Sequence, residues 1–291
     1  MRGKFKNNVG QASSLSTLAR KIWTGWKPVL LCFLLTACGE REIKRQTGEL
    51  RIVAMAPSIA EILFALGLAD ETVGVNRYSA YPPEVKEKPF IGGLYDPNWE
   101  RVVSLRPTLA IGLDSQRELA SQLNQLGIPF VGVAHERVDD IMKSILEIGD
   151  AAGTRAPAEK LYNELKTQME KFSRTPAERA PKILVCVGRD ETFSRMYVAA
   201  KNTFYDDIIT AVGGVNACVV TSAKYPEISP DGLATMRPDI IIDILPEHHQ
   251  TAPPDRARTV VMTNDYAWTP GPRFILLMQD FSEVIREYDS N

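Results

Sequence analysis

Short apolar runs alternate with helical patterns along most of the chain, and this rhythm limits the possible folds more than any other feature. The run RIVAMA at 51–56 is followed by SIAEILFALG, which begins at a serine, has helical apolar spacing and stops at Gly67. Further short runs are TVGVN, TLAIGLD and PFVGVA, separated by helical stretches such as SQRELASQLNQLG. Strands that alternate with helices predict a largely parallel sheet covered on both faces.

A long charged segment breaks this rhythm. APAEKLYNELKTQMEKFSRTPAER has a helical pattern with few strongly apolar positions, which is typical of a solvent-exposed bridge between domains. A second strand–helix series follows, through KILVCVG, YVAAKNTFYDDIITAVGG, RPDIIIDIL, TVVMTND and RFILLMQDFSEVIREY. The sequence therefore predicts an α/β fold of two Rossmann-like lobes with parallel sheets joined by one long rigid helix. The expected boundaries are 51–154 for the N-terminal lobe, 155–179 for the helix and 180–291 for the C-terminal lobe.

One phrase occurs in both series. PNWERVVSLRPTLAI and SPDGLATMRPDIIID each give a turn, an acidic residue, a short helical segment, Arg-Pro and a buried strand. Glu100 lies six residues before the first Arg-Pro pair and Asp231 six before the second, which favours an internal pseudo-repeat. Asn98 and Ser229 are natural N-caps, so both acids are expected in a first helical turn, where the helix dipole stabilises carboxylates.

Composition excludes two classes of protein. Hydrophobic residues make up 44% of the 291 residues and charged residues 24%, which are ordinary values for a globular protein and exclude wholesale disorder. The 34 lysines and arginines are balanced by 36 acids, for a net charge of -2. No basic footprint is present, so no nucleic-acid partner is expected.

The N-terminus predicts export. Basic residues precede PVLLCFLLTAC at 28–38, an apolar stretch much shorter than the roughly 20 residues of a membrane-spanning helix. The junction LTAC resembles the bacterial lipobox, which implies that 1–38 is a lipoprotein signal and that Cys38 is acylated. Acyl chains on Cys38 would anchor the protein to a lipid bilayer, on the periplasmic or extracellular side of a bacterial membrane. The alternative is an unmodified cysteine in an ordinary signal or helix. Residues 39–50 are polar and aperiodic, as in a tether.

Metal-ligating and catalytic residues are sparse. Cys186 and Cys218 could form a disulfide outside the cytoplasm, but neither has metal-ligand spacing, and a buried thiol is the plainer interpretation of Cys186. The histidines are His135, His248 and His249, and the last two are adjacent in a polar loop. No metal site is expected. The chain has no G-x-S-x-G, P-loop or G-x-G-x-x-G motif, so an enzyme is the less favoured alternative.

The chain resembles the cobalamin and ferric-siderophore substrate-binding proteins of ABC importers. The resemblance rests on RIVAMAPSIAEILFALGL, TVGVNRYSAYPPEV and IGGLYDPNWERVVSLRPTLAI in the first lobe, and on YVAAKNTFYDDIITAVGGVNA, YPEISPDGLATMRPDIIID and TPGPR in the second. It covers about residues 50 to 288 and implies a ligand cleft between two lobes, with a helical bridge that permits small closure. It also implies an ABC permease with its ATPase subunits as partner. The transported molecule, a corrinoid or an iron chelate, would then be cargo rather than cofactor.

The expected ligand residues follow strands or precede the repeated helices, where open α/β sheets present their sites. They are mainly aromatic, which suits flat or macrocyclic ligands. They are Arg77, Tyr78, Tyr81, Leu94, Tyr95, Tyr225 and Trp268.

The resemblance assigns finer roles to some of these residues. Tyr78 matches a cobalamin-contacting tyrosine, whereas Leu94 and Tyr225 stand where cobalamin-binding members have tryptophans. Tyr81 falls where some haem-binding relatives present an axial tyrosine. Ferric siderophores stay open as well, because their anionic groups would suit Arg77, Arg189 or Arg273. Glu100 and Asp231 are similar to the carboxylates, one on each lobe, that dock onto arginines of the permease.

Overall fold

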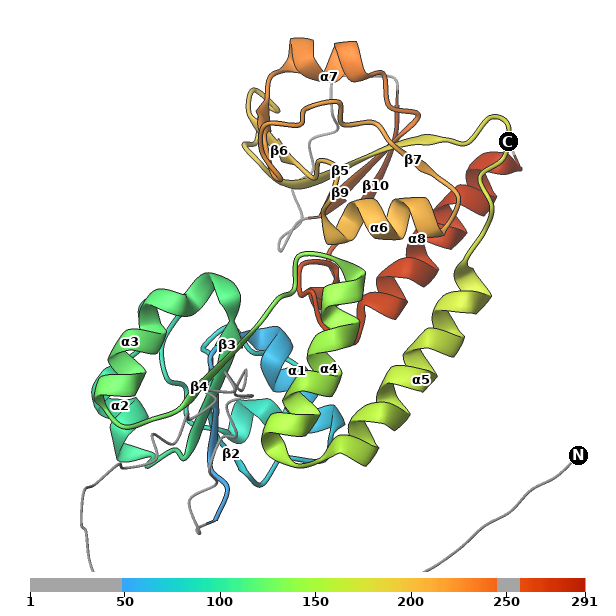
Figure 1. Ribbon diagram of the computed structural model, residues 1–291. Helices are drawn as coiled ribbons and strands as arrows, with labels where there is room; N and C mark the ends of the chain where they lie inside the picture. Colours follow the sequence, from blue (N-terminus) through green and yellow to red (C-terminus); the bar gives the residue numbers. More distant parts are fainter. Residues whose placement is uncertain (1–48, 245–256, 291) are drawn as a thin grey trace, which may run out of the picture. The chain divides into compact units, whose positions relative to one another are not determined.

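The computed structural model describes residues 49–244 and 257–290, all within one compact unit (Figure 1). The predicted signal, Cys38, His248 and His249 lie outside the described residues. Among those described, no helix is both long enough and apolar enough to cross a membrane. The helices are α1 (Pro57–Ala65), α2 (Trp99–Ser104), α3 (Arg117–Gln125), α4 (Val138–Ala152), α5 (Arg155–Phe172), α6 (Phe204–Ala211), α7 (Pro230–Met236) and α8 (Phe274–Asp289), with 3-10 turns η1 (Pro83–Glu87), η2 (Asp114–Gln116) and η3 (Asp265–Ala267).

The N-terminal sheet is entirely parallel. It contains β1 (Ile52–Ala54), β2 (Thr72–Val75), β3 (Leu109–Leu113) and β4 (Phe130–Val133), in the order β2-β1-β3-β4. Side chains alternate between its faces: Ile52 and Ala54 belong to one apolar cluster, Val53 and Met55 to another. Helices α1 and α4 cover the first face, and α2 and α3 lie on the other side (Figure 1). Gly67, with φ of 77°, ends the turn after α1 as predicted.

The C-terminal sheet is mixed. Its strands are β5 (Lys182–Arg189), β6 (Met196–Val198), β7 (Val215–Asn216), β8 (Glu227–Ile228), β9 (Ile240–Ile244) and β10 (Arg258–Met262). The order is β10-β9-β5-β6-β8, with β7 also paired to β5. The α/β fold with two sheets is confirmed, but β6 runs antiparallel to β5 and β8, unlike the predicted parallel arrangement. The loop from β5 to β6 is too short for the crossover that a parallel pair needs.

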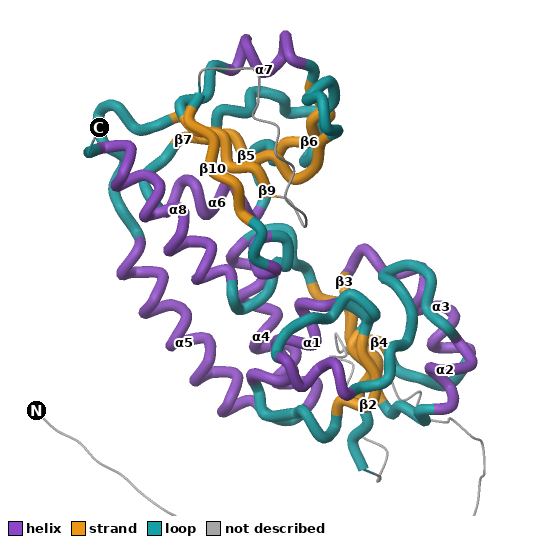
Figure 2. Tube along the Cα trace, turned by 180° about the vertical axis from the view of Figure 1, so that it is seen from behind, coloured by secondary structure: helices purple, strands orange, loops and turns teal. Residues whose placement is uncertain are grey.

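The two sheets share one apolar core. A single cluster contains Ile52 and Ile111 from the first sheet and Ile183 and Ile242 from the second. Contacts of α4 with α5 and α6, and of α8 with α5 and α6, carry this cluster from one sheet to the other (Figure 2). The lobes are therefore joined by packed helices as well as by chain connections.

Helix α5 corresponds to the predicted bridge, but it is shorter than predicted and packs against α4. It ends at Phe172 rather than at 179, because the chain turns extended at Ser173, ahead of Pro176. Only Ala158 and Leu165 are fully buried in it, as expected of an exposed bridge. It packs against α4, where a Cβ on Gly149 would lie 2.4 Å from the Ala158 Cβ. The bridge is thus a packed helix pair, and the lobe boundaries themselves remain predictions.

The repeated phrase has the same local structure in both lobes. The side chains of Asn98 and Ser229 cap α2 and α7 by accepting a hydrogen bond from the amide three residues later, at 2.9 Å and 3.3 Å. Each helix is followed by an arginine in the left-handed region, with φ of 47° at both Arg106 and Arg237. Proline and a buried strand come next in each case. The pseudo-repeat is therefore structural.

Candidate functional site

A cavity of about 280 Å³ lies where strands of the N-terminal sheet end. The turn from β1 into α1 forms part of its wall, as expected at the carboxyl edge of an open α/β sheet. Three of the predicted ligand residues, Tyr78, Leu94 and Trp268, line it together with Leu113 at the end of β3. The other lining residues are Ala56, Pro57, Ser58, Thr269 and Pro270.

A second cavity, of about 290 Å³, adjoins the first on the side of the C-terminal lobe. Trp268 and Pro270 line both cavities, and we call the two together the aromatic cleft. The predicted Tyr225 lies in the second cavity. Its remaining walls are His135, Val187, Phe204 and Tyr205. The aromatic cleft thus takes residues from both sides of the helical bridge.

Its three predicted aromatic residues expose much of their surface. Tyr78 is 59% exposed, Tyr225 44% and Trp268 40%. Exposed aromatic surface around adjoining cavities is typical of a site that a ligand covers. Lys224, the residue before Tyr225, forms an ion pair with Glu136 of the loop before α4. Burial and the nearby Glu136 carboxylate raise the pKa of Tyr225 to about 12, so it stays a neutral phenol.

Two other predicted ligand residues lie beside the cleft without lining either cavity. Arg77 donates a hydrogen bond to Asp96 at 2.7 Å, and its guanidinium lies 5.2 Å from the centre of the Tyr78 ring. Arg77 therefore contacts Tyr78 and is paired with a carboxylate, so it does not offer a free cation. The Tyr95 hydroxyl lies 3.3 Å from the Ser115 hydroxyl, and the side chain is exposed.

Tyr81 stacks on a buried ion-pair network. Its ring centre lies 4.0 Å from the Arg273 guanidinium carbon. Arg273 donates to Glu61 of α1 at 2.6 Å and to both oxygens of Asp265 at 2.8 Å. Burial lowers the pKa of Arg273, but the bonds to Asp265 and Glu61 outweigh it and raise that pKa. Burial also raises the pKa of Glu61, against the effect of Arg273. The network links α1 to the start of α8.

The arginines considered for anionic ligands are already paired. Arg189 is fully buried and bonds Asp243 at 2.8 Å, while the Phe193 ring lies 3.8 Å away. Arg273 and Arg77 are held by carboxylates as described above. Each guanidinium is thus paired with a carboxylate of the same chain, in a buried pair for Arg189 and in an exposed pair for Arg77.

His135 is a buried, neutral residue. Its ring nitrogens lie 2.9 Å from the Ser58 hydroxyl and 2.7 Å from the Ser144 hydroxyl. Burial lowers the pKa of His135 to about 4. Within 49–244 and 257–290, no group of three or more His, Cys, Asp or Glu side chains could hold a metal ion. Cys186 and Cys218 are both buried free thiols, so the structure contains no disulfide between them.

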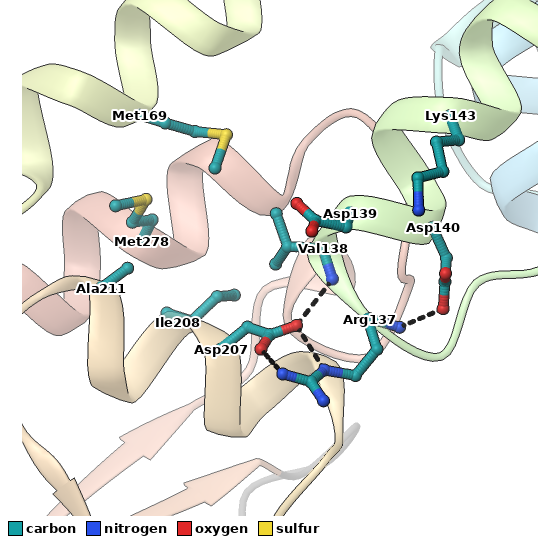
Figure 3. Close-up of a pocket in the computed structure, with 10 residues that line it drawn as sticks. All are labelled: Arg137, Val138, Asp139, Asp140, Lys143, Met169, Asp207, Ile208, Ala211 and Met278. Atoms are coloured by element: carbon teal, nitrogen blue, oxygen red, sulfur yellow. Dashed lines mark hydrogen bonds and ion pairs between the residues drawn. The ribbon is translucent and has the colours of Figure 1, made fainter.

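A separate pocket of about 390 Å³ lies among α4, α5, α6 and α8 (Figure 3). Its central contact is Asp207 of α6, which accepts a hydrogen bond from Nε of Arg137 at 2.8 Å and forms an ion pair with Nη2 of the same residue. Asp207 also accepts from the amide of Val138 at 2.9 Å, so it caps the first turn of α4. Met169 and Met278 supply apolar wall (Figure 3). No aromatic residue lines this pocket, unlike the aromatic cleft.

Glu100 and Asp231 are both exposed, in the first turns of α2 and α7. Their capped positions match the sequence expectation, and their docking role remains a prediction.

Several cleft residues were missed from the sequence. Tyr205 and Phe204 resemble ordinary core positions of an amphipathic helix, and nothing local to His135 marks it as part of a cavity. The β1–α1 turn could have been found, because it follows a parallel strand at the edge where such sheets bind ligands.

Comparisons with known proteins agree with this architecture. A family model described as "Periplasmic binding protein" matches residues 52–243. The ABC transporter substrate-binding lipoprotein YvrC of Bacillus subtilis is 28% identical over 201 residues, which are 66% of this chain and 62% of that protein, or less than two thirds of its length. The vitamin B12-binding protein of Photorhabdus laumondii is 23% identical over 251 residues, which are 83% of this chain and 90% of that protein.

Solved structures share the fold. The haem-binding protein RhuT from Roseiflexus in apo form has a TM-score of 0.69 at 24% identity, with 81% of this chain and 99% of that chain covered. The vitamin B12-binding protein BtuF of Vibrio cholerae has a TM-score of 0.66 at 21% identity, with 83% and 98% covered.

Proposed function

The chain belongs to the periplasmic binding protein family, and from this premise we propose that it captures a cobalamin-like corrinoid in the aromatic cleft and delivers it to an ABC permease. The family consists of substrate-binding proteins for transport, not of enzymes. An enzyme on this scaffold is therefore set aside. The proposal concerns the ligand, the membrane anchor and the docking surface.

The ligand proposal rests on two features of the site. Aromatic rings line the cleft, and the arginines considered for anionic ligands are already paired with carboxylates. Tyr78, Tyr225 and Trp268 offer broad apolar faces from both sides of the helical bridge. Apolar burial against such rings suits a large macrocycle, while the phenols keep a polar contact. Relatives named vitamin B12-binding proteins support the same ligand.

Anionic iron chelates fit this charge pattern less well. A ferric siderophore would need free cations, yet Arg189 and Arg273 are bound to internal acids. Breaking a buried ion pair to bind an external anion leaves the internal carboxylate uncompensated, which is costly.

Haem stays the second candidate because of Tyr81. Its phenol is 43% exposed beside the cleft, over the Arg273 guanidinium. A phenol in that position could reach a ligand iron, as the resemblance to haem-binding relatives suggested.

The membrane anchor and the permease contact complete the proposal. The LTAC junction before Cys38, together with a relative named as a lipoprotein, supports acylation of Cys38 in a bacterial envelope. The exposed acids Glu100 and Asp231, held in equivalent capped turns, support docking onto basic residues of the permease. The permease and its ATPase subunits would be the physiological partners.

A ligand panel tests the central claim. Purified protein is titrated with cyanocobalamin, haemin and a ferric siderophore by calorimetry. We expect a tight, reversible complex with cyanocobalamin and no turnover. Replacing Tyr78 and Tyr225 with alanine should weaken that complex by about 1–3 kcal/mol per ring, because the apolar contact is lost.

Tyr197 provides the matched control. It is 43% exposed, close to the value for Tyr225, and lines neither cavity of the cleft. The variant Tyr197→Ala should bind cyanocobalamin as the unaltered protein does. If the protein prefers haemin and Tyr81→Phe abolishes that binding, the proposed ligand is haem and not a corrinoid. Unchanged affinity in the Tyr78, Tyr225 double variant would move the site away from the cleft.

A further inference from the structure

Tyr205, a wall residue of the second cavity, contacts both the Tyr225 ring and the turn that carries Trp268. It belongs to α6 and is only 4% exposed. Its hydroxyl donates a hydrogen bond to the carbonyl of Ala267 at 2.8 Å, across 62 residues of sequence. Ala267 ends the turn η3, and Trp268 follows directly. This hydrogen bond ties α6 to the turn from which Trp268 enters both cavities.

The ring of Tyr205 also contacts Tyr225, which lines the second cavity as well. It meets Tyr225 edge to face, with ring centres 6.5 Å apart and planes at 87°. Phe204 packs on it as well, with centres 4.4 Å apart. Edge-to-face contacts of this kind stabilise the orientation of aromatic rings. Tyr225 and Trp268 come from loops more than 40 residues apart in sequence, and Tyr205 contacts the first and the residue before the second.

We propose that Tyr205 is a positioning residue, which holds Trp268 and Tyr225 in their ligand-binding orientations before a ligand arrives. The choice of cyanocobalamin as ligand rests on the proposed function. The effect of Tyr205 on Trp268 can be measured in the protein without any ligand. Rings that are already held in place lose less freedom on binding, so the protein binds more tightly.

The chemistry of the site suits a fixed anchor. Burial raises the pKa of the Tyr205 phenol, so the hydroxyl keeps its proton throughout the physiological range and remains a donor. Ala267 is fully buried, and its carbonyl loses this donor if the hydroxyl is removed. A buried carbonyl without its partner is unfavourable, which drives the turn to rearrange.

The fluorescence of Trp268 can show whether the hydrogen bond from Tyr205 to Ala267 restricts its side chain. The full-length chain contains four tryptophans, at positions 23, 26, 99 and 268. Replacing Trp23, Trp26 and Trp99 with phenylalanine leaves Trp268 as the one fluorophore. In this background, Tyr205→Phe keeps the ring and removes the hydrogen bond. The control Tyr288→Phe removes a phenol that bonds Asp239, away from the cleft.

Two measurements test the proposal on proteins whose folding is checked by circular dichroism. Without ligand, Tyr205→Phe should make Trp268 more accessible to acrylamide and lower its fluorescence anisotropy. Cyanocobalamin affinity should fall roughly fivefold to tenfold, the usual consequence of losing one buried hydrogen bond. Tyr205→Leu, which also removes the contact with Tyr225, should lose more affinity. Tyr288→Phe should change neither measurement.

The outcomes separate this proposal from the proposed function. If Tyr205→Phe leaves the quenching and anisotropy of Trp268 unchanged, the positioning role is refuted, whatever the ligand is. If the unaltered protein does not bind cyanocobalamin, the corrinoid proposal fails. In that case the fluorescence of Trp268 still decides whether Tyr205 positions it.

Discussion

Asp207 of α6 should control how firmly helix α4 is held against the C-terminal lobe. It accepts two bonds from the Arg137 guanidinium and one from the Val138 amide (Figure 3). A hydrogen bond to a charged group contributes about 1.5–3 kcal/mol, but the Arg137 side chain is 37% exposed, so water partly compensates for its loss. We expect Asp207→Ala to lower the free energy of unfolding by about 2–3 kcal/mol, and Asp207→Asn by about 1 kcal/mol because one acceptor oxygen remains.

Hydrogen exchange measures the local part of this effect. The amide of Val138 should lose protection in Asp207→Ala, because an uncapped helix start opens more readily. Urea denaturation gives the global part. The neighbour Asp206 is the control, since it accepts its bonds from Asn202 and Asn216 within the same lobe. Asp206→Asn should leave the exchange of Val138 unchanged. If Val138 stays protected in Asp207→Ala, the cap does not hold α4, and the packed core alone joins the lobes.

Three further outcomes are expected. The pKa of His135 is lowered from 6.5 to about 4, so folding disfavours its protonation, and stability should fall as the pH drops from about 6.5 towards 4. Urea denaturation at pH 7 and pH 5 should show a loss of about 2 kcal/mol that is absent in His135→Gln. Cys38→Ser should abolish lipid labelling and release the protein from the membrane fraction, and a variant that stays membrane-bound would contradict the lipobox interpretation. Changing Glu100 to glutamine and Asp231 to asparagine together should weaken permease binding at unchanged ligand affinity; if docking survives and only about 0.3–1 kcal/mol of stability is lost at each site, these acids serve the helix dipole alone.

Local features of the fold could be predicted well from the sequence. The strand–helix order follows from apolar periodicity, which depends on residues a few positions apart. The caps at Asn98 and Ser229 and the stop at Gly67 were predicted for the same reason, since each is decided within one turn of chain. The sequence placed Tyr78 and Trp268 in loops and Tyr225 just before a repeated helix, and all three residues line the cleft.

Features that depend on distant residues could not be predicted in the same way. The pairing of Arg273 with Glu61 joins residues 212 positions apart, and no local pattern specifies it. As a result, Arg273 looked like a free cation in the sequence and is neutralised in the structure. Tyr205 was missed because a buried tyrosine on an amphipathic helix has the same pattern whether it fills a core or supports a site. The antiparallel strand β6 was missed because strand direction depends on the connecting loop.

The capped turns of α2 and α7 have a consequence for how a permease could distinguish loaded from empty protein. Each acid lies in a first helical turn that is capped by a side chain two residues before it, Asn98 for Glu100 and Ser229 for Asp231. A local cap of this kind does not depend on what occupies the cleft. If these acids dock as proposed, each contact offers the permease the same chemical signal in both states. Through these two contacts, the permease could then distinguish loaded from empty protein only by the distance between the two acids. The chemical groups that it meets would be the same in both states.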